Sequence, residues 1–243
     1  MQTLKLFDDN AYAKECAARV VFAYPDAIVL DQTVFYPEGG GQIGDTGLLQ
    51  MIDGREILVT NTRKQDLELG GGAIFHYLGG TLSAGDIPLV GSMVQCRLDW
   101  ERRYRIMKMH TAAHLMCAIL PYAVNGCHIT DGSARIDFVT NDAFDKEQIE
   151  QTLNALIASG CEVQSLKVSS NDVKNNTALV RTINSLPPLE DDQVRMVKIG
   201  DLDIQPCGGT HVKSISELGR ICVIKTKKVS ATCRRIVLGL NNT

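Results

Sequence analysis

The chain has no uninterrupted apolar run near 18 residues, no secretory signal segment and no lipidation motif. A membrane-spanning helix needs roughly 20 apolar residues, so the sequence predicts no membrane attachment. The eight cysteines have no regular spacing, which argues against a disulfide framework. We therefore expect reduced thiols and a cytoplasmic location.

A phosphate-binding loop is also missing, although one segment is rich in glycine. Residues 38–47, EGGGQIGDTG, contain no lysine and no helix-forming run follows them. Their glycines allow close approach of the backbone, and polar residues such as Thr33 and Gln42 lie nearby in the sequence. We interpret the segment as a lip that reaches the active site of another domain, with a plain hairpin turn as the alternative.

Two of the five histidines are four residues apart, and a cysteine and a histidine later in the chain have the same spacing. His110 and His114 are four residues apart, as are Cys207 and His211. Residues i and i+4 of a helix share one face, so both imidazoles of the first pair can reach one ion. Gly208 and Gly209 favour a turn that brings the second pair together. Three nitrogens and one sulfur suit zinc, so we predict one zinc ion per chain.

Other metal sites fit the sequence less well. A metalloprotease has glutamate directly after the first histidine, where this chain has Thr111. Zinc fingers space their ligands within one small module, whereas these pairs lie far apart. Cys117 would lie ~10 Å along the helix from His110, too far to share its ion, so we expect it in the core. The long stretch of sequence between the two pairs is typical of a cleft in which each wall supplies two of the ligands.

The residues around both pairs resemble the editing domain of alanyl-tRNA synthetase. The matching blocks are HTAAHL, GSARIDF from Gly132 to Phe138, CGGTHV, and RRI from Arg234 to Ile236, with FYPEGGGQIGDTG similar to the motif of the accessory domain. They look still more like the free-standing AlaX-type trans-editing proteins. The blocks extend from about Thr33 to Leu238.

This resemblance implies a zinc-dependent deacylase that cleaves the ester of mischarged tRNA(Ala), first Ser-tRNA(Ala) and second Gly-tRNA(Ala). The four metal ligands would then form the catalytic centre. Either one ligand yields to water or substrate, or the metal holds the aminoacyl group while another water attacks. Alanine is smaller than serine, so the pocket must demand a hydroxyl. Thr33 is our first candidate for that contact and Gln42 our second.

Two alternative functions remain at this stage. The chain is either an editing protein for another aminoacyl-tRNA, or a tRNA-binding or scaffold protein with structural zinc and no turnover. The net charge of −3 is unusual for a nucleic-acid binder. Basic residues do cluster near the C-terminus, and we predict that Arg234 and Arg235 contact phosphates of a tRNA acceptor stem. A solvated basic face is the competing interpretation.

The pattern of elements predicts an α+β protein with two domains. Short β-type runs with glycine-rich turns predict a small β-barrel over residues 1–90, bounded by the turn-rich stretch 79–92. Residues 91–243 would form a two-layer domain with helices on a largely antiparallel sheet.

The second domain is predicted to begin with an amphipathic helix from Trp100 to Leu120, which Pro121 ends, and to contain a second helix over 144–159. Predicted strands cover 127–130, 133–139, 161–169, 193–199, 202–206, 220–230 and 233–240. Residues 178–192, which contain Pro187 and Pro188, are predicted to form a loop. In the resembled family this loop lies near the mouth of the cleft, and a plain surface connection is the alternative.

Overall fold

The computed structural model describes residues 2–66, 72–80, 83, 85–175 and 192–241. The chain divides into two compact units. The first contains residues 1–39 and 43–103, and the second contains residues 40–42 and 104–243. The short segment Gly40–Gln42 therefore belongs to the second unit, although the chain on both sides of it belongs to the first.

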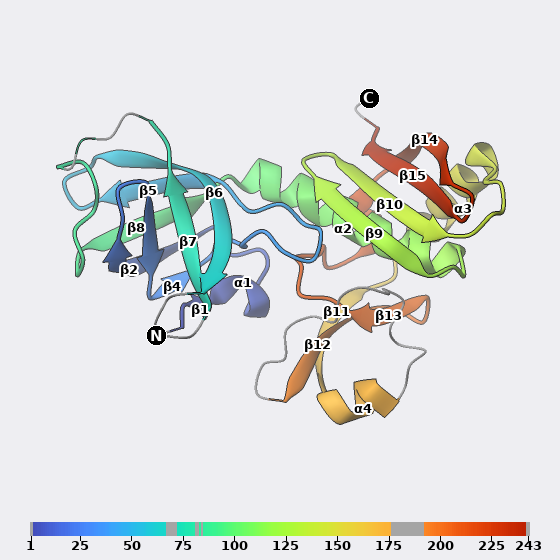
Figure 1. Ribbon diagram of the computed structural model, residues 1–243, viewed down its shortest axis with the longest axis horizontal. Coiled ribbons are helices and arrows are strands. Elements are labelled where there is room, and N and C mark those ends of the chain that lie inside the picture. The colour runs from blue at the N-terminus through green and yellow to red at the C-terminus, as the bar shows by residue number, and fades with distance from the viewer. Residues whose placement is uncertain (1, 67–71, 81–82, 84, 176–191, 242–243) are drawn as a thin grey trace. The chain divides into compact units, whose positions relative to one another are not determined.

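The first unit contains a closed barrel of six strands in the order β2-β3-β7-β6-β5-β8 (Figure 1). These strands are β2 (Glu15–Ala23), β3 (Ala27–Leu30), β5 (Gly47–Met51), β6 (Glu56–Asp66), β7 (Gly72–Leu78) and β8 (Met93–Leu98). The short elements outside the barrel are β1 (Leu4–Lys5), α1 (Leu6–Asp9) and β4 (Gln32–Thr33). The predicted N-terminal barrel is confirmed.

Strand β8 is the part of the barrel that sequence analysis missed. It closes the barrel by pairing with β2 and β5, yet it lies beyond the expected boundary at residue 90. Its pattern alternates, with Val94, Cys96 and Leu98 buried and the residues between them more exposed. This period of two is the signal for a strand with one buried face.

Among its described residues, the second unit contains two antiparallel sheets and three helices. The helices are α2 (Trp100–Ile119), whose first turn lies in the first unit, α3 (Lys146–Ala158) and α4 (Ser170–Asn175), with a 3-10 turn η2 (Ile215–Leu218). The strands are β9 (Val124–Thr130), β10 (Ser133–Val139), β11 (Val163–Ser169), β12 (Gln193–Ile199), β13 (Asp203–Pro206), β14 (Ile221–Ser230) and β15 (Cys233–Leu240). The α+β class with largely antiparallel sheets is confirmed.

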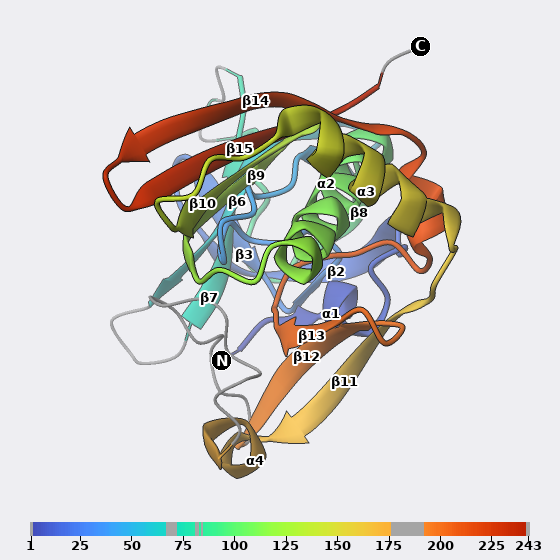
Figure 2. The ribbon, with the colours of Figure 1, turned by 90° about the vertical axis from the view of Figure 1, so that its right-hand side faces the viewer.

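The larger sheet has the order β14-β15-β10-β9, and the described helices that pack against it lie on one of its faces (Figure 2). Its buried face carries apolar residues such as Ile136, Phe138 and Leu238. Helix α3 also satisfies the edge strand β14, because Asn154 hydrogen bonds both backbone groups of Ile221. An edge strand with satisfied backbone groups is protected from pairing with another chain.

The smaller sheet has the order β11-β12-β13 and a small core of its own. Val173 of α4 packs there with Val194 and Met196 of β12. In β13 the usual pattern is reversed, because the polar residues Asp203 and Gln205 are buried while Ile204 is partly exposed. Buried polar side chains need partners, so this strand points to a polar site.

Helix α2 is buried all around from Met109 to Cys117. The predicted helix bounds agree closely with the structure, but the amphipathic pattern predicted for it was wrong. A helix that is buried on every side lies inside the molecule, and Figure 2 shows α2 between the four-stranded sheet and the three-stranded sheet. Its histidines are therefore removed from bulk water.

The predicted loop at 178–192 lies outside the described residues except for Asp192. Within the described part of the chain, no helix combines the length and apolar character needed to span a membrane.

Candidate metal centre

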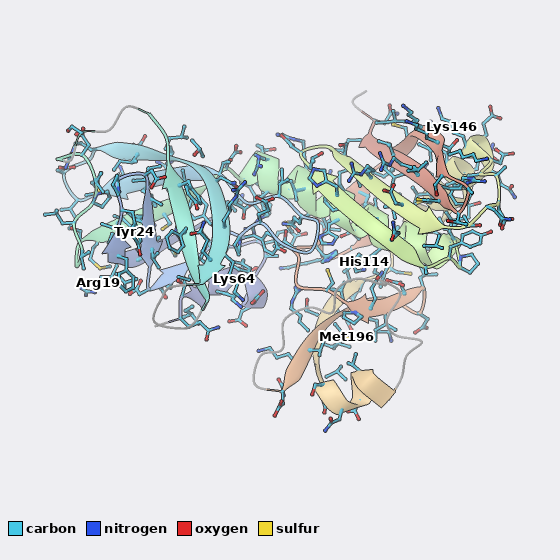
Figure 3. The ribbon with its side chains drawn as sticks, in the orientation of Figure 1. Arg19, Tyr24, Lys64, His114, Lys146 and Met196 are labelled. Carbon is cyan, nitrogen blue, oxygen red and sulfur yellow. The ribbon has the colours of Figure 1, made fainter. Side chains whose placement is uncertain are left out.

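Four side chains meet beside the buried stretch of α2. His110 and His114 project from neighbouring turns of the helix, and Cys207 and His211 come from the segment that follows β13. Their ligand atoms all lie within 4.8 Å of one another, so the group can hold a metal ion. The predicted convergence of the two pairs is confirmed. In Figure 3, His114 lies between the four-stranded sheet and Met196 of β12.

The thiol of Cys207 contacts two of the three histidines. Its Sγ is 3.3 Å from His211 Nε2 and 3.5 Å from His110 Nε2. The three imidazole rings also contact one another, and the centroids of His110 and His211 are 4.3 Å apart. Three nitrogens and a sulfur around one point match the donor set of a tetrahedral metal site.

The opposite nitrogen of each ring contacts an oxygen. His110 Nδ1 lies 2.8 Å from Gln42 Oε1, and His211 Nδ1 lies 3.1 Å from the hydroxyl of Thr111. His114 Nδ1 lies 3.3 Å from the carboxylate of Asp203. Metal-binding histidines commonly use the second ring nitrogen in this way, because the contact fixes the ring and its tautomer. Both the four ligands and the contacts of their second ring nitrogens therefore fit a bound metal.

The electrostatics of the group favour a thiolate. Burial alone would raise the pKa of Cys207, but the nearby rings of His110, His211 and His114 outweigh it and hold that pKa well below its usual value. Burial would lower the pKa of His114, but the Cys207 thiolate and Asp203 raise it to about 9. Burial and the neighbouring His110 hold the pKa of His211 well below its usual value. His211 is therefore neutral beside the thiolate, which is the form that binds metals, whereas His114 must release its proton when a metal binds.

Arg195 of β12 holds the loop that carries Cys207. Its Nη1 donates to the carbonyl oxygens of Cys207 and Gly209, each at 2.8 Å. The glycine at 209 is required by space, since a Cβ there would lie 2.2 Å from Cε1 of His110. The loop can therefore close over the helix only with glycine at this position.

The residues predicted to bind substrate have different partners in the structure. Gln42 lies in the metal centre. Thr33 lies in the first unit, where its buried hydroxyl is 2.8 Å from His76 Nε2. Arg235 forms a bidentate ion pair with Asp137, in which Nε and Nη2 donate to the two carboxylate oxygens at 2.7 and 2.8 Å. Arg234 instead donates to backbone carbonyls, including that of Ser230. A role in binding substrate stays a prediction for each of the four residues.

Cys117, which was predicted to lie in the core, is buried. Thr111, Asp203 and Arg195 were not predicted as parts of the site. A signal existed for Asp203, because Asp203, Gln205 and Cys207 alternate along β13 and into the next segment, so they point to one face. All eight cysteines, which lie within the described residues, are outside disulfide bonds.

Comparison with known proteins places this centre in a family. Residues 194–237 match the threonyl and alanyl tRNA synthetase second additional domain, and residues 2–102 match the class II (A) tRNA synthetases. The alanine–tRNA ligase of Sulfurisphaera tokodaii is 33% identical over 237 residues, which cover 93% of this chain but only 25% of that ligase.

Two free-standing proteins are similar over nearly the whole chain. The alanyl-tRNA editing protein AlaX-L of Pyrococcus horikoshii is 34% identical over 241 residues, which are 96% of this chain and 56% of that protein. AlaX-M of Methanosarcina barkeri is 34% identical over 248 residues, which are 98% of this chain and 99% of that protein. This chain therefore belongs to the AlaX family of alanyl-tRNA editing proteins.

Proposed function

We propose that this protein is a cytoplasmic, zinc-dependent deacylase that hydrolyses mischarged tRNA(Ala) in trans. Ser-tRNA(Ala) is the first proposed substrate and Gly-tRNA(Ala) the second. The observation that carries the proposal is the buried group of His110, His114, Cys207 and His211 in a chain of the AlaX family. One zinc ion per chain would bind there.

Zinc is the metal that these four donors favour. Thiolate together with imidazole suits zinc, whereas magnesium, calcium and manganese prefer oxygen ligands. The low pKa of Cys207 supports this choice, because a ligand thiol must lose its proton before it binds. The oxygens of Gln42, Thr111 and Asp203 would hold the rings in place.

The reaction needs modest help, since the ester between an amino acid and a ribose is already activated. A bound zinc ion would supply Lewis-acid polarisation of a carbonyl group or of water. Asp203 contacts Nδ1 of His114, so we assign it to orienting that ring rather than to removing a proton from water. The burial of α2 around His110 and His114 would keep bulk water away from the ester.

The acceptor stem of tRNA(Ala) is the proposed partner, and the open face of the four-stranded sheet supports its binding. Residues paired across antiparallel strands share a face. Arg135 and Lys225 both pair with Val237, and Arg235 pairs with Lys227, so these basic residues lie on the face away from Phe138 and Ile236. Asp137 is the acidic residue among them. This face is basic although the whole chain has a net charge of −3, so it is complementary to phosphates.

Discrimination between serine and alanine requires a partner for the serine hydroxyl. We keep Thr33 as the first candidate and Gln42 as the second. Both are buried and already hydrogen bonded, Thr33 to His76 and Gln42 to Thr210. If one of these groups also bonds the serine hydroxyl, alanine would leave that additional hydrogen bond unmade and would bind less well.

Metal analysis of the purified protein, combined with deacylation assays on Ser-, Gly- and Ala-tRNA(Ala), tests the proposal. We expect about one zinc per chain and turnover of Ser-tRNA(Ala) well above that of Ala-tRNA(Ala). Binding of tRNA with zinc present but no turnover would instead indicate a scaffold protein. Turnover of a different charged tRNA in a wider panel would indicate another editing substrate.

A further inference from the structure

The glycine-rich segment enters the second unit at the metal centre. The backbone oxygen of Gly41 accepts a hydrogen bond of 2.7 Å from the Ile129 amide, and Gln42 forms a parallel bridge with Ile129 of β9. Gly41 has a φ of 82°, and a Cβ there would lie 2.4 Å from the carbonyl oxygen of Cys127. Only glycine fits such a close approach with positive φ. The segment is therefore built to lie against β9.

This placement delivers Gln42, whose side chain has one possible orientation. Its Oε1 lies 3.0 Å from the backbone nitrogen of Thr210, and its Nε2 lies 2.9 Å from the hydroxyl of Thr210. A backbone N–H can only donate, so the amide oxygen must face it. The same oxygen lies 2.8 Å from His110 Nδ1.

The orientation of the amide decides the tautomer of His110. Because Oε1 can only accept, Nδ1 of His110 must carry the hydrogen. In the neutral ring the lone pair is then on Nε2, the nitrogen that lies 3.5 Å from Cys207 Sγ. Gln42 thus presents the metal-binding nitrogen of His110 to the other ligands.

A second glycine, Gly209, leaves space for the contact between Gln42 and His110. A Cβ on Gly209 would lie 2.4 Å from His110 Nδ1 and 2.8 Å from Gln42 Oε1. It would occupy the space in which these two atoms meet. Glycines of two segments that lie far apart in the sequence therefore serve one hydrogen bond.

We propose that Gln42 is a positioning residue for the metal, and that the glycine-rich segment serves to deliver it to His110. This inference rests on the metal binding in the proposed function. Gln42 differs from Thr111 and Asp203 in how far it lies from the ligands along the chain. Thr111 directly follows His110, and Asp203 lies on β13, just before Cys207. Gln42 is 68 residues from His110 and comes from neither ligand-bearing segment.

Zinc affinity of the full-length chain tests the proposal, measured by competition with a chromophoric chelator. Gln42→Met keeps the size of the side chain but removes both hydrogen-bonding groups, and we expect zinc binding about 10- to 100-fold weaker. Gln42→Glu keeps an accepting oxygen and should restore binding to near the wild-type level. Gln32→Met is the matched control, because Gln32 donates to Ala17 in the first unit, and it should bind zinc as wild type does.

Two further measurements separate positioning from loss of fold. The visible spectrum of the cobalt-substituted protein should change in Gln42→Met and return in Gln42→Glu. In wild-type zinc protein labelled with ¹⁵N-histidine, NMR should show His110 bound through Nε2 with hydrogen on Nδ1.

Ligation of His110 through Nδ1 would overturn the proposal even if Gln42→Met does not fold. A folded Gln42→Met protein with wild-type zinc affinity would also overturn it. Wild-type protein that binds no zinc would instead refute the metal binding in the proposed function.

Discussion

Cys207 and Cys117 have different surroundings although both lie near the ligand histidines. Cys207 contacts Nε2 of His110 and of His211, whereas Cys117 is buried in the core part of α2. We expect Cys207→Ala to lose most of the roughly one zinc ion per chain, because it removes the charged donor. Cys117→Ala should keep its zinc. Equal zinc loss in both variants would mean that the wrong cysteine was assigned as the ligand.

His76 gives the first unit a dependence on pH. Burial lowers its pKa to about 4, whereas in the unfolded chain its pKa is near the usual 6.5. Between these values the unfolded state binds a proton that the folded state does not, so stability is full above pH 6.5 and is lost as the pH falls toward 4.

We expect the free energy of unfolding to fall by roughly 2 kcal/mol more between pH 7 and pH 5 in wild type than in His76→Gln. Urea unfolding of both proteins at the two pH values measures this difference. The same fall in both proteins would exclude His76 as its source.

The loop after β13 offers a matched pair of glycines. A Cβ on Gly209 would collide with the ring of His110, whereas a Cβ on Gly208 would meet nothing within 4 Å. We expect Gly209→Ala to displace the ring or the loop and to weaken zinc binding at least tenfold, the size of effect seen when a supporting contact is lost. Gly208→Ala should bind zinc normally. Isothermal titration of both variants checks this, and equal affinities would show that the loop adapts without cost.

The elements differ in how far local sequence accounts for them. Strands β10, β12 and β15 have the bounds that their alternating patterns predicted, because each buries one face of a sheet. The bounds of helix α2 were predicted closely, but its burial on every side was not. A pattern shows which residues are apolar, but burial of His110 and Thr111 depends on what covers the helix from other parts of the chain.

Binding of tRNA should depend on the open face of the four-stranded sheet. We expect the double variant Lys225→Gln, Lys227→Gln to weaken binding of all acceptor stems alike and to reduce the slope of log K against log salt by about 1 to 2. Lys167→Gln, Lys198→Gln removes the same charge from the three-stranded sheet and should leave the slope unchanged. Equal slopes for all three proteins would return this face to a solvated surface without a partner.

Discrimination of substrates should depend on Thr33 if its hydroxyl takes part in the pocket. We expect Thr33→Val to reduce the ratio of kcat/KM for Ser-tRNA(Ala) over Ala-tRNA(Ala) by about 5- to 150-fold, equivalent to roughly 1 to 3 kcal/mol. His76→Gln is a useful comparison, because it changes the hydrogen-bond partner but keeps the hydroxyl. A lower stability of Thr33→Val with an unchanged ratio would assign this hydroxyl to the architecture of the barrel.

Local sequence was sufficient for most of the elements and for the four candidate metal ligands. Helix geometry places His110 and His114 on one face because they are four residues apart, and two glycines allow the turn between Cys207 and His211. These relations hold within a few residues, so they can be derived without the fold. The same reasoning identified the barrel from its short alternating strands.

The partners of the ligands depended on contacts between distant segments. The hydrogen bond from His110 to Gln42 and the place of β8 in the barrel both follow from which strands pair and what packs on α2. No local period encodes such contacts, because the free energy of packing and of hydrogen bonding depends on atoms brought together by the whole chain. The candidate metal site could thus be predicted from spacing, whereas the hydrogen-bond network around it could be recognised only in the folded protein.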